Sequence, residues 1–186
     1  MGWFFGYGSL VNHLTHGNRP LRAARLDGWR REWCLTTIRP VAFLSARPCP
    51  GSAIDGLVAQ VPGGDWSALD AREYAYERSH VTAQMTDERI AEPVQVYSVS
   101  ADHRAAEGSG TILASYLDVV VEGYQHHFGE AGVANFFATT DGWDRPVTDD
   151  RAAPAYPRAR PVAPAIRAMT DAHLASLGAA LVPPES

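Results

Sequence analysis

The stretch from Phe5 to Leu10, FGYGSL, combines two glycines with a tyrosine and a serine directly after an apolar run. Gly6 and Gly8 let the backbone turn tightly and approach a ligand closely. Successive N–H groups at such a turn can bind an anion, either a carboxylate or the oxyanion of a reacting carbonyl. We therefore expect the amides of residues 6 to 10 to face one pocket.

A carboxylate on an apolar helix face is the second feature that could do chemistry. The pattern of residues 66–77 predicts a helix on which Trp66, Leu69 and Tyr76 fall within an arc of about 80°. Glu73 projects into the same arc, where burial would raise its pKa and suit it to act as a general base near neutral pH. Two alternatives remain: Glu73 reaches water or pairs with Arg78, or Glu77, at the margin of the arc, is the functional carboxylate.

Other catalytic devices do not match. The chain has 16 arginines and no lysine, which excludes a phosphate-binding lysine of the Walker type, a Schiff base and a pyridoxal phosphate anchor. Gly6 and Gly8 begin like a dinucleotide fingerprint, but Val11 breaks the pattern. Ser9 follows a strand like a nucleophile elbow, yet it lacks the second glycine of G-x-S-x-G.

The histidines lack the spacing of a zinc site. His13 and His16 do not form H-E-x-x-H, and neither does the pair His126 and His127. Adjacent histidines are expected to point to different sides of a helix. The sequence therefore predicts no metal and no other cofactor.

Composition limits the class of protein. The 186 residues are 46% hydrophobic and 20% charged, which predicts one folded domain over 1–186. We find no secretion signal and no apolar run of about 18 residues that could span a membrane. Cys34 and Cys49 have no metal-ligand spacing and fit a reducing compartment, so we expect a cytoplasmic protein. The net charge of −5 argues against a nucleic-acid partner.

Arginines concentrate near the N-terminus. This segment could attract an anionic substrate, although a solvated strand face is the plainer interpretation. Seven lie in the first fifty residues: Arg19, Arg22, Arg25, Arg30, Arg31, Arg39 and Arg47.

Strands precede most helices along the chain. This order predicts the α+β class, and about five short strands make closure into a small barrel plausible. An irregular segment follows over 141–164. We expect strands at 3–7, 22–36 around an Asp27-Gly28 turn, 54–61, 80–85 and 94–100, and helices at 66–77, 111–128, 133–138 and about 170–181.

Two motifs in this order resemble the γ-glutamylcyclotransferase family, including its ChaC-like branch. FFGYGSL matches the family's Y-G-S turn after the first strand, and LDAREYAYER matches its L-D-x-x-E helix. The resemblance continues through Val96-Tyr97-Ser98 and Ser115-Tyr116-Leu117. It implies a small closed mixed β-barrel with flanking helices. It also implies an enzyme that releases 5-oxoproline from a γ-glutamyl compound.

The resemblance also assigns roles to residues. Glu73 becomes the catalytic general acid and base, and Leu10 after Y-G-S is similar to the ChaC-like branch. The substrate stays open between glutathione, a γ-glutamyl amino acid and a γ-glutamylamine. The resemblance implies that the substrate contacts Phe5, Gly6, Tyr7, Gly8, Ser9, Leu10 and Tyr116.

Helical spacing independently predicts that Tyr116 faces inward, because Ile112 and Val120 lie four residues before and after it on the same apolar face. Its hydroxyl then contacts either a pocket or, as in many cores, a backbone carbonyl. The 141–164 segment is expected to cover the pocket mouth, with Trp143 and Tyr156 affecting the choice of substrate.

Two further classes stay open. The first is a small-molecule binding or regulatory module without catalysis in the same pocket. A desolvated carboxylate at Glu73 argues against it, because binding alone needs no base. The second is an interaction domain that presents the arginine-rich strands to an anionic partner, which a pI near 5.8 disfavours. The oligomeric state is left open.

Overall fold

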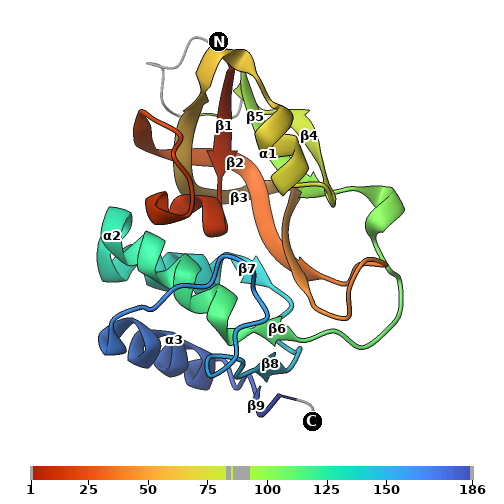
Figure 1. Ribbon diagram of the computed structural model, residues 1–186, viewed down its shortest axis with the longest axis vertical. Helices are drawn as coiled ribbons and strands as arrows, with labels where there is room; N and C mark the ends of the chain where they lie inside the picture. The colour runs from red at the N-terminus through yellow and green to blue at the C-terminus, as the bar shows by residue number, and fades with distance from the viewer. Residues whose placement is uncertain (1, 83–84, 86–92, 185–186) are drawn as a thin grey trace.

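The two longest strands, β2 (Leu21–Cys34) and β3 (Phe43–Val61), pair antiparallel and form one hairpin (Figure 1). The computed structural model describes residues 2–82, 85 and 93–184. The expected turn at Asp27-Gly28 is wrong, because β2 runs through these residues. Gly28 instead has a φ of 74° at a β-bulge, where the pairing with β3 shifts. Pairing on both sides of the bulge keeps the strand continuous.

The remaining strands build a mixed sheet around this hairpin. β1 (Gly2–Gly6) confirms the first expected strand and pairs antiparallel with β3 and parallel with β5 (Val94–Val99). β4 (Tyr76–His80) lies at the edge beside β5. β7 (Thr140–Asp141) pairs parallel with β2, which gives the order β4-β5-β1-β3-β2-β7.

The sheet is not closed into a barrel, so that part of the fold prediction is wrong. The far edge of β2 pairs with the two-residue β7 at Arg31 and Thr140. In the described part of the chain, the connection after β4 reaches β2 at one isolated bridge, between Leu26 and Met85. Barrel closure needs a continuous ladder around the circumference. The α+β class itself is confirmed.

The helix expected over 66–77 is shorter. α1 (Ser67–Arg72) ends at Glu73, whose φ of −101° and ψ of 34° leave the helical region. The chain then joins β4, where Tyr76 pairs with Val99. The strand expected over 80–85 is misplaced, because β4 covers Tyr76–His80 and residues 81–82 are not in a strand; residues 83–84 lie outside the described residues. After Glu73, pairing of β4 with β5 therefore decides the structure, and the helical pattern of the sequence does not.

A helical layer packs against the sheet. α2 (Ala114–Ala138) joins the two helices expected over 111–128 and 133–138, with a bend at Gly129, whose φ is 65°. α3 (Pro164–Ser176) lies beside α2 (Figure 1). It starts earlier than the expected 170–181 helix because Pro164 suits the first turn. Among the described residues, no helix is both long and apolar enough to cross a membrane.

The main core lies between the sheet and α2. Side chains of β1, β2, β3 and α2 form one apolar cluster that includes Phe5, Leu26, Leu57, Val120 and Phe136. Beside it, β6 (Ile112–Leu113), β8 (Val147–Thr148) and β9 (Leu181–Val182) form a small parallel sheet. In this second sheet β8 lies between β9 and β6, the strand that leads into α2.

The irregular segment over 141–164 is fixed to both helices by two of its residues. The Asp150 carboxylate accepts the Ser115 N–H at 2.8 Å and the Ser115 hydroxyl at 2.6 Å, and so caps α2. Arg151 binds both carboxylate oxygens of Asp118 at 2.8 and 2.9 Å and also binds Asp171 on α3 at 2.8 Å. These contacts hold the segment in one place.

Replacing the capping carboxylate tests this attachment. Asp150→Ala leaves the Ser115 amide and hydroxyl without their acceptor, so we expect the free energy of unfolding to fall by about 2 kcal/mol in a urea titration. Asp144→Ala is the matched control, because Asp144 is exposed in the same segment. Its effect should stay within about 0.5 kcal/mol. Equal losses in both variants would contradict the capping role of Asp150.

Candidate functional site

A cavity of about 170 Å³ lies at the end of β1, between α1 and the start of α2. This volume exceeds the needs of a single water more than tenfold. All eight residues expected at the site line it: Phe5, Gly6, Tyr7, Gly8, Ser9, Leu10, Glu73 and Tyr116. Its wall also includes Arg39, Tyr76 and Tyr97, which the sequence named without placing them at this site, and Arg72, Pro157 and Arg158, which it did not single out.

The glycines of the turn are required by the protein's own packing. A Cβ on Gly8 would lie 2.6 Å from the Tyr116 hydroxyl, and one on Gly6 would lie 2.6 Å from the Cβ of Leu10. After Gly8 the chain forms a short 3-10 turn over Ser9–Val11. The Ser9 N–H donates to the Tyr116 hydroxyl at 3.3 Å, so this amide of the turn faces the helix that borders the cavity.

Glu73 lies in the turn after α1, where its side chain is only 14% exposed. The prediction that Glu73 lies on the apolar face of a helix is wrong. Its side chain nevertheless points inward to the cavity, because the chain turns at this residue. Burial raises the pKa of the Glu73 carboxyl, while the neighbouring guanidinium of Arg72 and then that of Arg158 oppose the rise. The proposed pairing with Arg78 does not occur: Arg78 binds Asp70 at 3.0 Å.

The rival carboxylate is placed elsewhere. Glu77 lies exposed on β4 and is not among the residues that line the cavity. The separation follows from the early end of α1, because Glu77 belongs to a strand and not to the helix that carries the motif.

Arg72 connects Glu73 to the turn after β1. Its Nε binds Glu73 Oε1 at 2.9 Å, and its Nη1 donates to the Thr15 carbonyl at 3.0 Å. Its Nη2 donates to the Ser9 hydroxyl at 3.2 Å. The guanidinium therefore fixes the carboxylate relative to Ser9. The sequence analysis missed Arg72, although a cation next to a candidate buried carboxylate was a usable signal.

Two tyrosines meet across the cavity. Tyr116 is half-buried on α2, and its ring lies 5.0 Å edge-on from that of Tyr156. Burial raises the pKa of Tyr116. The Tyr116 hydroxyl thus contacts a backbone amide at the cavity rather than a core carbonyl. The Tyr156 hydroxyl is buried with no hydrogen-bond partner within the described residues.

Trp143 does not line the cavity. Its indole stacks on Phe137 with centroids 5.0 Å apart, and its N–H donates to the Phe137 carbonyl at 3.1 Å. Of the two aromatic residues expected to affect substrate choice, the structure therefore brings Tyr156 to the cavity and leaves Trp143 in packing.

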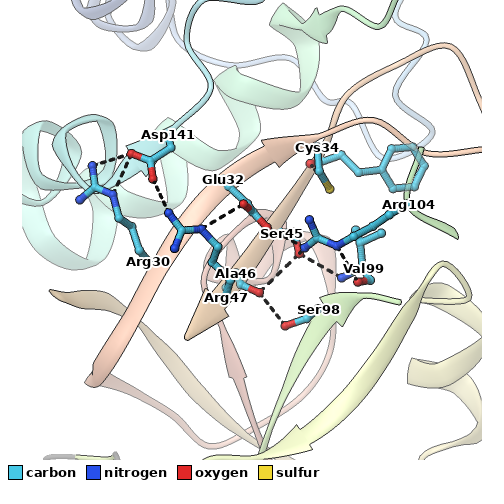
Figure 2. Close-up of polar contacts among 11 residues, drawn as sticks. Arg30, Glu32, Cys34, Ser45, Ala46, Arg47, Ser98, Val99, Arg104 and Asp141 are labelled. Atoms are coloured by element: carbon cyan, nitrogen blue, oxygen red, sulfur yellow. Dashed lines mark hydrogen bonds and ion pairs between the residues drawn. The ribbon is translucent and has the colours of Figure 1, made fainter. Parts of the chain in front are cut away.

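Most of the arginines near the N-terminus contact other residues of the same chain. Figure 2 shows Asp141 between Arg30 and Arg47, and Glu32 between Arg47 and Arg104. Carboxylates from β2 and β7 thus neutralise this strand face.

Arg31 departs from both interpretations of the arginine cluster, because it has no exposed surface. Within the cluster of seven, Arg39 is the member that lines the cavity. Arg72 also lines the cavity but is paired with Glu73, so charge available to an anion at the site comes from Arg39 and Arg158.

A family model described as "Gamma-glutamyl cyclotransferase, AIG2-like" matches residues 4–115. This match covers more than half of the chain, so the protein belongs to that family. No curated protein matches the chain in sequence.

Solved structures share the fold at low identity. One named gamma-glutamyl cyclotransferase has a TM-score of 0.56 and 13% identity, over 91% of this chain and 98% of that one. An uncharacterized protein from Homo sapiens has a TM-score of 0.56 and 14% identity, over 91% and 97%. YkqA from Bacillus subtilis has a TM-score of 0.55 and 16% identity, over 75% of this chain and 55% of that one.

The ion pair at the cavity predicts how the Glu73 carboxyl titrates. Arg72→Met removes the cation that opposes the effect of burial, so the pKa of Glu73 should rise. A ¹³C NMR titration measures it, with the Glu73 resonance assigned by its absence in Glu73→Gln. Arg78→Met removes a guanidinium that pairs with Asp70 and should leave the Glu73 titration unchanged. A fall in the Glu73 pKa in Arg72→Met would show that the ion pair does not hold it down.

Proposed function

We propose that the protein is a γ-glutamyl cyclotransferase that releases 5-oxoproline from a γ-glutamyl compound, with Glu73 as general acid and base. The observation that carries the proposal is the position of the buried Glu73 carboxylate in the same cavity as the turn of residues 5–10. The family membership supports the same class of reaction.

The substrate supplies its own nucleophile. The α-amine nitrogen forms a bond to the γ-carbonyl carbon, and the bond from that carbon to the leaving amine breaks. The α-ammonium loses two protons as it becomes the ring amide, and the leaving amine gains two. Holding the glutamyl chain folded in the cavity gives this attack an effective concentration of about 10⁵ M or more. The protein must therefore provide proton transfer, charge stabilisation and orientation.

Glu73 suits the proton transfers. A carboxylate with a raised pKa removes a proton from the α-ammonium more readily than an ordinary glutamate does. The same carboxyl group can then deliver the proton to the leaving nitrogen. Arg72 keeps the ionised form available and orients it through Ser9 and Thr15. This division of labour requires neither a metal nor a covalent intermediate.

Charge on the substrate matches the cavity wall. The Tyr116 hydroxyl accepts from the Ser9 N–H at 3.3 Å, and its own proton can be donated to the developing oxyanion. Arg39 and Arg158 line the same cavity and supply positive charge for a substrate carboxylate. Leu10 and Tyr156 border the space as less polar walls, so they contribute to the choice among glutathione, γ-glutamyl amino acids and γ-glutamylamines.

The assignment of the base is tested by paired substitutions. Glu73→Gln should keep the fold and lower turnover about 100-fold or more, because it removes the proton acceptor. Glu77→Gln, on an exposed strand position, should retain activity. Formation of 5-oxoproline from a panel of γ-glutamyl compounds measures both variants. If the wild-type protein binds a panel member with no 5-oxoproline formed, it is a binding module instead.

The aromatic wall gives a separate prediction on specificity. Tyr156→Phe removes a buried hydroxyl in the cavity and should change the ratio of kcat/KM values between two γ-glutamyl substrates. Trp143→Phe is the control from the same segment and should leave that ratio unchanged, because Trp143 does not line the cavity. Comparing ratios cancels any loss of folded protein. The reverse pattern would place Trp143, and not Tyr156, in the determination of specificity.

A further inference from the structure

Three histidines from two distant parts of the chain meet outside the cavity. His13 begins a 3-10 turn over His13–Thr15, and His126 and His127 lie on α2. One ring nitrogen from each lies within 4.8 Å of the others. The rings of the adjacent pair are only 4.6 Å apart, so the expectation that they point to different sides of the helix is wrong. His13 lies against both, with ring centroids 4.6 and 5.3 Å away.

Two of these rings present nitrogens that the protein leaves unused. His13 Nδ1 and His127 Nε2 are both buried and have no hydrogen-bond partner in the described residues. A neutral imidazole carries one nitrogen lone pair that either accepts a hydrogen bond or ligates a metal. Buried nitrogens without partners are uncommon in folded proteins, so this pair calls for a ligand.

The surroundings favour neutral rings. Burial, followed by the neighbouring His126, lowers the pKa of both His13 and His127, to about 4 for the latter. Transition metals bind imidazole through a nitrogen lone pair of the neutral ring. Glu122 holds the adjacent backbone in place, since its carboxylate accepts from Asn12 at 2.7 Å and from Arg160 at 2.5 Å.

We propose that His13, His126 and His127 form a binding site for a divalent transition-metal ion of the class that prefers imidazole, Zn²⁺ first among them. Zinc–nitrogen distances of 2.0–2.1 Å place tetrahedral ligands about 3.3 Å apart, so the rings must draw together by side-chain rotation. The exposed His126 has the freedom to do this. Three imidazoles leave one tetrahedral position for water.

The proposed ion joins the turn to α2 rather than taking part in chemistry at the cavity. None of the three histidines lines the cavity. The turn they fasten ends at Thr15, whose carbonyl accepts the hydrogen bond from Arg72. A metal bound there has a structural role, because His13 is two residues from Thr15, which holds the Arg72 partner of Glu73.

Zinc binding to the full chain without a polyhistidine tag tests the proposal. After treatment with chelator and dialysis, the protein should bind one Zn²⁺ per chain in isothermal titration calorimetry. Saturating Zn²⁺ should raise its Tm by about 5 °C, the scale expected for a ligand that binds only the folded state. Bound Co²⁺ should show the visible absorption of a tetrahedral site.

Substitutions separate the site from adventitious binding. His126→Gln removes an exposed ligand without disturbing the core and should weaken Zn²⁺ binding at least tenfold, with loss of the Tm increase. His13→Gln should do the same. His80→Gln, on the outer strand β4, is the matched control and should bind like wild type. The proposal is overturned if wild type takes up no stoichiometric Zn²⁺, or if His126→Gln binds it as tightly.

Discussion

The buried guanidinium of Arg31 is the interaction on which the arrangement of the sheet, α2 and the candidate site depends. It donates to the Tyr7 carbonyl at 3.1 Å, to the Asp55 carbonyl, and to hydroxyls of Tyr124 and Thr139 at 2.5 and 2.6 Å. These partners belong to the turn after β1, to β3 and to α2 with the residue that follows it. A desolvated cation is costly unless its donors are satisfied. The need to satisfy this one therefore holds the turn of residues 5–10 in register with the hairpin and the helix.

Sequence patterns predicted the elements that keep one local pattern along their whole length, such as β1, β5 and the body of α2. It was wrong where tertiary pairing decides the outcome. Asp27-Gly28 has the composition of a turn, yet the partner strand β3 continues the ladder past it. The helical pattern after Glu73 is likewise overruled by pairing with β5. The burial of Arg31 could have been predicted, because Trp29, Arg31 and Trp33 are two residues apart and therefore lie on the same face of β2.

The candidate site was more predictable than the fold around it. The glycine turn and Glu73 are local signals, and all eight expected residues line one cavity. What periodicity could not supply were contacts between distant segments. Arg72 matters because of Thr15 and Ser9, and Tyr156 because the Asp150 cap directs its segment to the cavity. Such contacts depend on the packing of one element against another, which no single stretch of sequence contains.

The attachment of the 141–164 segment gives the cavity a modular construction. The family match ends at residue 115, one position before Tyr116, so the wall formed by residues 156–158 lies beyond the shared region. That segment is connected to the helices through Asp150 and Arg151, and at the cavity its Tyr156 packs against Tyr116. Chimeric proteins could therefore carry the 141–164 segment of a relative, attached to α2 through Asp150 and Arg151, while the part of the cavity that contains Glu73 is kept.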